Sequence, residues 1–261
     1  MFKPTLAFLF LLLLTTFSNA QEQNQDQEFY QLKIYHFEDE AQVERTDDYL
    51  KNAYLPALKE TGIQNTGVFK PHENGKNDSI KKTYVLIPFQ SLEQWESINE
   101  ELGKNENFLK KAEDFINSDY KDTPYLRFES TLLKAFEDMP QMEASALEGP
   151  REDRVYELRS YESPTETLFQ NKVDMFNDGE VEIFDELGFN AVFYAEVISG
   201  PDMPNLMYMT TFPDKESRDE HWKQFGEAPA WKKLSSKPEY PPYNVSHADI
   251  LFLYPTEYSD Y

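Results

Sequence analysis

An internal duplication constrains the fold of this chain more than any other feature. Residues 155–161 read VYELRSY, and a degenerate copy, FYQLKIY, stands at residues 29–35. Side-chain character alternates in both copies, and successive side chains of a strand point to opposite faces, so each segment is predicted to be a β-strand. The chain is therefore expected to fold as two related units.

Each of these strands has one apolar and one polar face. In the second copy Tyr156 and Leu158 form the apolar face, whereas Glu157, Arg159 and Tyr161 form the polar face. If the apolar faces pack against helices, the polar side chains lie on the uncovered side of each sheet. The uncovered sides are then expected to meet, so that the polar residues lie between the two sheets.

The segments that follow each copy keep the same order. An apolar stripe with helical spacing (Leu50, Ala53, Tyr54, Ala57, Leu58) precedes Gly62, and Ile183, Phe184 and Leu187 precede Gly188. These patterns predict helices that end at a glycine in the left-handed conformation. Second and third strands are predicted at 66–70 and 83–87, and at 190–198 and 206–212. Second helices, capped by Ser91 and Asp214, carry Trp95 and Trp222, and last strands close the units at 127–133 and 245–253.

This order, β-α-β-β-α-β, is the ferredoxin-like arrangement, with an antiparallel sheet ordered 4-1-3-2. The fold class is therefore predicted to be α+β, with tandem ferredoxin-like units that form an intrachain dimeric α/β-barrel. The expected boundaries are a signal peptide at 1–20, a disordered leader at 21–28, a first, degenerate unit at 29–136, an acidic linker at 137–153 and a second unit at 154–261.

The start of the chain resembles a secretory signal peptide. Lys3 is followed by an apolar run from Leu6 to Leu14 and by small residues that end at Ala20. Cleavage before Gln21 is expected, which would place the mature protein in the periplasm or outside the cell, with no membrane insertion of the mature chain. The chain has no cysteine and a net charge of -23. Disulfides and thiolate chemistry are thereby excluded, and nucleic acid is a poor partner for so acidic a surface.

Several blocks of the second unit resemble the NIPSNAP family. They are YELRSY at 156–161, the Leu187-Gly188-Phe189 turn, Ser199-Gly200-Pro201 before LMYM at 206–209, and Trp222 followed by PAWK at 229–232. In the first unit Lys33 replaces the arginine and Gln31 the glutamate. The resemblance implies the dimeric α/β-barrel superfamily, which includes small monooxygenases, lactone isomerases and haem-dependent chlorite dismutase-like enzymes. Fold does not fix function, and the chemistry of this family is poorly defined.

A candidate site follows from the predicted strand order, because the last strand lies beside the first. His247 and Asp249 share one face of that last strand and are expected to converge with Glu157, Arg159 and Tyr161. In a ligand site, Arg159 would hold a carboxylate or enolate and His247 would act as general base or acid. Aromatic walls would come from Tyr161, Tyr194 and Trp222. The alternative is that Arg159 only links Glu157 and Asp249 and locks the strands together.

No metal site is predicted, because a third and fourth ligand beside His247 and Asp249 cannot be placed. No cofactor is predicted either; a haem ligand among His36, His72, His221 and His247 is suggested by superfamily analogy only.

Two functions remain open. One is an exported NIPSNAP-domain protein that binds a small hydrophobic or aromatic anion between its two sheets, with cofactor-independent oxygenase or isomerase activity as a further option. The other is a non-catalytic structural or protein-interaction module. The sequence predicts a pseudo-dimer within one chain and leaves further oligomerisation open.

Overall fold

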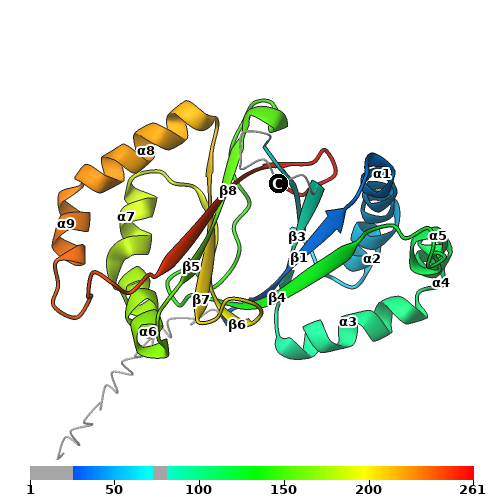
Figure 1. The fold of residues 1–261 in the computed structure, drawn as a ribbon, viewed down its shortest axis with the longest axis horizontal. Coiled ribbons are helices and arrows are strands. Elements are labelled where there is room, and N and C mark those ends of the chain that lie inside the picture. Colours follow the sequence, from blue (N-terminus) through cyan, green and yellow to red (C-terminus); the bar gives the residue numbers. More distant parts are fainter. Residues whose placement is uncertain (1–25, 73–80) are drawn as a thin grey trace, which may run out of the picture.

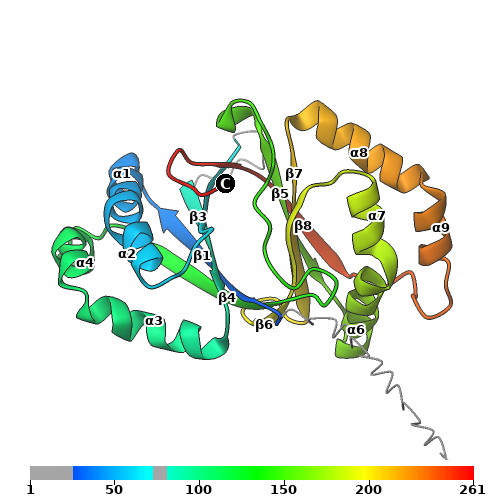
Figure 2. The ribbon, with the colours of Figure 1, turned by 180° about the vertical axis from the view of Figure 1, so that it is seen from behind.

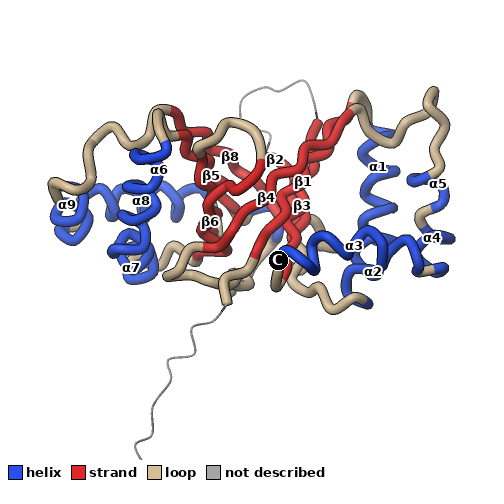
Figure 3. The backbone as a smooth tube through the Cα atoms, turned by 90° about the horizontal axis from the view of Figure 1, so that it is seen from below, coloured by secondary structure: helices blue, strands red, loops and turns tan. Residues whose placement is uncertain are grey.

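The computed structural model describes residues 26–72 and 81–261. Two α+β units lie side by side, with their strands in the middle of the molecule and their helices on the two outer sides (Figures 1 and 3). The expected signal peptide lies outside the described residues. Within the described part of the chain, no helix combines the length and apolar character needed to cross a membrane.

The first unit runs from β1 to β4, and each predicted strand of this unit is present. Its elements are β1 (Phe29–Phe37), α1 (Glu40–Tyr49), the π-helical turn η1 (Leu50–Tyr54), α2 (Leu55–Glu60), β2 (Gly67–Pro71), β3 (Lys81–Phe89), α3 (Leu92–Lys104), α4 (Glu106–Lys111), α5 (Glu113–Ile116) and β4 (Arg127–Ala135). The predicted cap Ser91 accepts a hydrogen bond from the backbone N–H of Gln94, which satisfies a free donor at the start of α3.

The second unit repeats this order after a short 3₁₀ turn, η2 (Arg151–Asp153). Its elements are β5 (Val155–Glu162), α6 (Glu166–Met175), the π-helical segment η3 (Phe176–Glu180), α7 (Val181–Glu186), β6 (Ala191–Ser199), β7 (Asn205–Phe212), α8 (Lys215–Glu227), α9 (Pro229–Ser235) and β8 (His247–Pro255). Gly62 and Gly188 end the first helical stretch of each unit with φ values of 89° and 76°, as predicted. Leucine or alanine would be strained at these angles.

The two sheets join into one closed barrel. The strand order is β1-β3-β2-β8-β5-β7-β6-β4, so each unit keeps the predicted 4-1-3-2 order. The sheets join at two seams, where β2 pairs with β8 and β4 with β6, both antiparallel. Figure 2 shows the two halves from behind, with the helices outside the strands on either side. Closure leaves no free sheet edge, which removes the main route by which sheets aggregate.

The barrel interior holds the apolar faces of the strands, so the predicted orientation of the two faces is wrong. Tyr30 and Leu32 of β1 pack in one core with Tyr156 and Leu158 of β5. The polar faces instead lie under the helices, where separate clusters form in each unit. A closed barrel encloses its inner face on all sides, and unpaired charges cannot remain there. Beneath the helices Glu157 and Arg159 are also buried, but they pair with each other, which offsets the cost of burying their charges.

The segment between the units packs onto the barrel. Met142 joins the barrel core, and Met139 joins the cluster beneath the second unit's helices. The last residues of the expected leader are also held in place, since Gln27 donates a hydrogen bond to the Ala135 carbonyl oxygen and the Glu28 N–H to that of Pro140. These contacts fix the entry to β1 at the end of the barrel where Met142 lies.

Shortening Leu158 to alanine tests which face is the core. Leu158 is 3% exposed inside the barrel, whereas Ile250, on the other face of the neighbouring strand β8, is 42% exposed. We expect Leu158→Ala to lower the free energy of unfolding by about 2–5 kcal/mol. Ile250→Ala should change it by about 0.5 kcal/mol or less. Urea unfolding of both variants measures the difference, and equal losses would contradict the assigned faces.

Candidate functional site

The structure divides the predicted site between two faces of the second sheet. In the β5–β8 pairing Arg159 lies opposite Ile250, whereas Asp249 lies opposite Ser160 and His247 opposite Glu162. Paired residues point to the same face, so His247 and Asp249 point away from Arg159. The expected convergence of His247 and Asp249 with Glu157, Arg159 and Tyr161 is therefore wrong. The register between β5 and β8 decides which of their residues share a face, and alternation within each strand does not determine that register.

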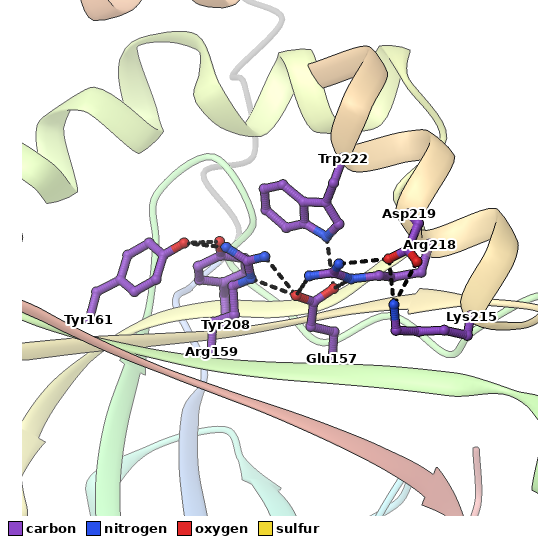
Figure 4. Close-up of polar contacts among 8 residues, drawn as sticks. All are labelled: Glu157, Arg159, Tyr161, Tyr208, Lys215, Arg218, Asp219 and Trp222. Atoms are coloured by element: carbon purple, nitrogen blue, oxygen red, sulfur yellow. Dashed lines mark hydrogen bonds and ion pairs between the residues drawn. The ribbon is translucent and has the colours of Figure 1, made fainter. Parts of the chain in front are cut away.

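Glu157 is the centre of a buried polar network beneath α8 (Figure 4). Its carboxylate accepts hydrogen bonds from Arg159 Nε at 2.8 Å, from Trp222 Nε1 at 2.7 Å, and from Arg218 Nε and Nη2 at 2.8 and 2.6 Å. The Glu157 side chain is fully buried. Two guanidinium groups and an indole thus surround one carboxylate, so its charge is fully compensated.

Arg159 connects this carboxylate to a pair of phenols (Figure 4). Its guanidinium carbon lies 3.5 Å from the centre of the Trp222 ring, a close cation–π contact. Its Nη1 donates to the Tyr161 hydroxyl at 2.7 Å, and the hydroxyls of Tyr161 and Tyr208 lie 2.8 Å apart. Burial, followed by the neighbouring Tyr161, raises the pKa of Tyr208 well above its usual value. Arg159 therefore has no free face for a ligand carboxylate.

Tyr194 and Trp222, the other predicted aromatic residues, lie in the same layer. Tyr194 stacks on Tyr208 with ring centres 5.6 Å apart, and Trp222 packs against Phe184 and Phe189. Arg218 and Tyr208 were not predicted from the sequence. Arg218 precedes Trp222 by one helical turn, so this spacing on α8 was the available signal for it.

A second buried ion pair lies beneath the π-helical segment of this unit. Lys172 Nζ and Glu180 Oε2 are 2.6 Å apart, and both side chains are nearly fully buried. Gly179, with φ of 134°, produces a kink just before Glu180. Burial raises the pKa of Glu180, and the Lys172 charge opposes that rise. Residues 50–54 form the equivalent π-helical turn in the first unit. This pair was not predicted from the sequence.

His247 and Asp249 meet a third group, Glu162, on the other face. The atoms of the three residues that could bind a metal ion all lie within 4.8 Å of one another, and His247 Nε2 is 3.4 Å from Asp249 Oδ2. Glu162 supplies the third metal-type ligand that the sequence could not place, because the register sets it opposite His247. The His247 and Asp249 side chains are 56% and 50% exposed, so water can solvate these charges without an ion.

The remaining histidines have partners of their own. His36 Nε2 lies 2.7 Å from a carboxylate oxygen of Glu129, and a ring nitrogen of His72 lies 2.9 Å from the Arg154 carbonyl oxygen. His221 contacts the carbonyl oxygen of Ser217 on its own helix at 2.6 Å. These positions give no support to the haem analogy.

Comparison with known proteins assigns the second unit to a family. Residues 156–260 match the NIPSNAP family profile. The second unit is a NIPSNAP domain. No protein of curated function matches the chain.

Solved structures share the fold of both units together. A provisionally assigned monooxygenase from Lactobacillus acidophilus NCFM is 11% identical, with 88% of this chain and 94% of that chain covered and a TM-score of 0.53. A provisionally assigned monooxygenase from Fusobacterium nucleatum is 8% identical, with 88% and 93% covered and a TM-score of 0.52. An anthrone oxidase-like protein is 10% identical, with 89% and 93% covered and a TM-score of 0.51. At these identities the likeness concerns the fold alone.

The first unit, outside the NIPSNAP match, keeps the cation of this site but not its carboxylate. Gln31 and Lys33 occupy the places of Glu157 and Arg159. Gln31 donates to the Ser130 hydroxyl, and Lys33 Nζ donates to the Tyr54 hydroxyl at 3.1 Å. Among the described residues no carboxylate lies within ion-pair distance of Lys33.

Rings surround this lysine. Its Nζ lies 5.0 Å from the centre of the Tyr54 ring and 5.9 Å from that of Phe128. Tyr35 packs against Tyr125 and Phe128 at 5.4 and 5.8 Å. Burial raises the pKa of Tyr35 to about 12, although the Lys33 charge lowers it. We refer to Lys33, Tyr35, Tyr54, Tyr125 and Phe128 as the Lys33 cluster.

Replacing Glu157 with glutamine tests whether the NIPSNAP network is structural. The change leaves two buried guanidinium groups sharing a neutral partner, so we expect unfolding free energy to fall by about 3–5 kcal/mol. Chemical denaturation measures the loss. Glu220→Gln on the exposed side of α8 is the control and should be nearly neutral. A loss below about 1 kcal/mol, as exposed ion pairs give, would contradict this role.

The same variant should alter the acid dependence of stability. Burial alone would raise the pKa of Glu157, but hydrogen bonding from Arg218 and the charges of Arg159 and Arg218 hold it below its usual value. The unfolded chain therefore binds this proton more readily. The stabilisation is complete above the ordinary glutamate pKa of about 4.3 and declines as the pH falls below it. Glu157→Gln should flatten this decline in denaturation curves recorded from pH 6 to pH 3.

Proposed function

We propose that the protein is an exported binding protein for a small aromatic or hydrophobic anion, and that the Lys33 cluster of the first unit holds this ligand. The NIPSNAP domain then serves as the scaffold against which the first unit is built. This location differs from the space between the two sheets, because the apolar core of the barrel fills that space.

The single observation that carries the proposal is the absence of a carboxylate partner for Lys33. The chain has 48 acidic residues and only 25 lysines and arginines, so an acidic partner would be easy to supply. In the second unit the equivalent arginine is paired with Glu157. In the first unit the glutamate has become Gln31, and the cation has been kept. A partly buried cation without its counter-ion favours an anion from outside the chain.

The rings of the cluster favour an aromatic or apolar ligand. Tyr35 and Tyr54 are buried, and they would provide apolar contact beside the ammonium group. Phe128 is 48% exposed, and Lys33 itself is partly exposed, so a small molecule in solvent can reach the cluster. The partly exposed Phe128 ring next to the Lys33 ammonium group suits a planar carboxylate or phenolate.

Binding is better supported than catalysis. His247 was the expected acid or base, and it lies on the opposite face from Arg159. Proton transfer needs a group of matched pKa within about 2.6–3.2 Å of the reacting atom. Lys33 Nζ has the Tyr54 hydroxyl at 3.1 Å, but burial raises the pKa of that phenol, which makes it a poor proton donor. The monooxygenase-like and anthrone oxidase-like neighbours make oxygenation of an aromatic compound the reaction to test once a ligand is found.

A structural or interaction module is the second candidate, and the second unit favours it. Every charge of the Glu157 network is paired within the chain, as expected for residues that only hold α8 on the sheet. Carboxylate binding by a Lys33 variant distinguishes the two candidates, since only the binding protein needs the charge of Lys33.

Replacing Lys33 with methionine should abolish most of the binding of an aromatic carboxylate. We use 4-hydroxybenzoate and 1-naphthoate as probes, with 1-naphthalenemethanol as the neutral control, in isothermal titration calorimetry. A charge-assisted hydrogen bond contributes about 1.5–3 kcal/mol, so affinity for the carboxylates should fall at least about tenfold. Lys33→Arg should retain binding.

Two outcomes would reject the proposal. One is carboxylate binding that is unchanged in Lys33→Met, and the other is absence of binding to wild type by every carboxylate of the panel. Lys59→Met, which removes a more exposed lysine bonded to Asp260, controls for the change in net charge.

Export is tested separately. Expression of the full chain in a host with a secretory pathway should yield a protein outside the cytoplasm whose N-terminus is Gln21, read by mass spectrometry. Substitution of charged residues into the apolar run, such as Leu11→Arg, should keep the chain in the cytoplasm with its first residues intact. Recovery of uncleaved wild type from the cytoplasm would contradict export.

A further inference from the structure

A carboxylate lies buried at the entrance to β1 without a cation. Glu28 is 7% exposed. One of its oxygens accepts a hydrogen bond from Gln90 Nε2 at 2.7 Å, and the other accepts from the backbone N–H of Met142 at 2.8 Å. Both contacts hold the carboxylate in one orientation, but neither partner carries charge.

Nothing in the described part of the chain neutralises this group. Glu28 forms no ion pair with the lysines, arginines or histidines of residues 26–72 and 81–261. A buried carboxylate without a cation costs several kcal/mol. The nearby Tyr30 supplies no positive charge, because burial and then the Glu28 charge raise the pKa of this phenol and keep it neutral. Neutral donors therefore satisfy its hydrogen bonding, and a cation would have to come from outside this set of residues.

A cavity adjoins the carboxylate. Its volume is about 240 Å³, and it lies between the α2–β2 connection, the end of β3, the start of α3 and the segment that joins the two units. Besides Glu28, its polar lining consists of four carboxamide side chains (Gln64, Asn65, Gln90, Gln94). Its apolar lining includes Ile63, Pro88 and Met142. The cavity is smaller than the roughly 300–1,000 Å³ typical of sites for drug-sized ligands, so it suits a small molecule.

We infer that this cavity binds a small organic cation with a primary ammonium group, which donates to the Glu28 carboxylate. An ammonium group has three donors and no acceptor. Glu28 can accept a hydrogen bond from one N–H of the ammonium group, and carboxamide oxygens around the cavity can accept from the other two. Ile63 and Pro88 can contact a short alkyl chain. The net charge of -23 raises the local concentration of cations near the protein.

This site is independent of the proposed anion site. None of its lining residues belongs to the Lys33 cluster, and the ligand has the opposite charge. An inorganic cation is the weaker alternative, because Ca²⁺ takes six to eight oxygen ligands and usually several carboxylates, whereas this cavity offers one carboxylate.

Calorimetric titration of the full chain with n-butylamine tests the inference, with n-butanol as the neutral probe of the same length. Wild type should bind the amine and not the alcohol. Glu28→Gln keeps the size and the hydrogen-bond acceptor but removes the charge, so amine affinity should fall at least about tenfold. The same variant should melt at an equal or higher temperature without amine, since it removes an uncompensated buried charge.

The control variant is Glu143→Gln, which makes the same change in net charge at an exposed position outside the cavity and should bind n-butylamine as wild type does. The inference is overturned if n-butylamine does not bind, if n-butanol binds equally well, or if Glu28→Gln binds the amine unchanged. It is also overturned if KCl or CaCl₂ at equal ionic strength displaces the amine from wild type with higher affinity than the amine itself.

Discussion

The closed barrel is the constraint on which the rest of the structure depends. Both seams, β2 with β8 and β4 with β6, join one unit to the other, so neither unit can close without its partner. The shared interior is one core, in which Tyr30 and Phe193 from different units meet edge to face at 5.5 Å. Because this interior has no access to water for unpaired charges, the apolar face of every strand is directed inward. Polar residues of the strands can then lie only beneath the helices or towards the barrel ends.

The orientation of the faces determines which polar residues can act together. Arg159 and Tyr161 lie beneath α8. Arg159 packs against the Trp222 ring and donates a hydrogen bond to the Tyr161 hydroxyl. His247 is directed to the barrel side near its end, where Glu162 and Asp249 are its neighbours. His247 and Arg159, on neighbouring strands, are thus held on opposite faces of the sheet.

The architecture could be predicted from the sequence because it depends on local signals. Alternation at VYELRSY, the glycines at 62 and 188, and the caps at Ser91 and Asp214 each depend on a few neighbouring residues, and the duplication allowed each to be checked twice. The site was less predictable because alternation shows that a strand has two faces without showing which one is enclosed. It also gives no register, and a shift of one residue between β5 and β8 exchanges Asp249 for Ile250 beside Arg159. Arg218 and Glu180 were missed since their roles depend on contacts between distant segments.

The two units differ in how the charges at equivalent positions are paired. In the second unit Glu157 pairs with two arginines, and Lys172 pairs with Glu180 under the kinked helix. The equivalent places in the first unit hold Gln31 and Tyr54, which leaves Lys33 bonded to a phenol. Glu28, at the start of the same unit, is likewise bonded only to neutral groups. An unpaired buried charge such as that of Glu28 lowers stability, and a partly buried one such as that of Lys33 does so to a lesser degree, unless a ligand compensates it. Both proposed ligand sites thus lie in the unit outside the NIPSNAP match.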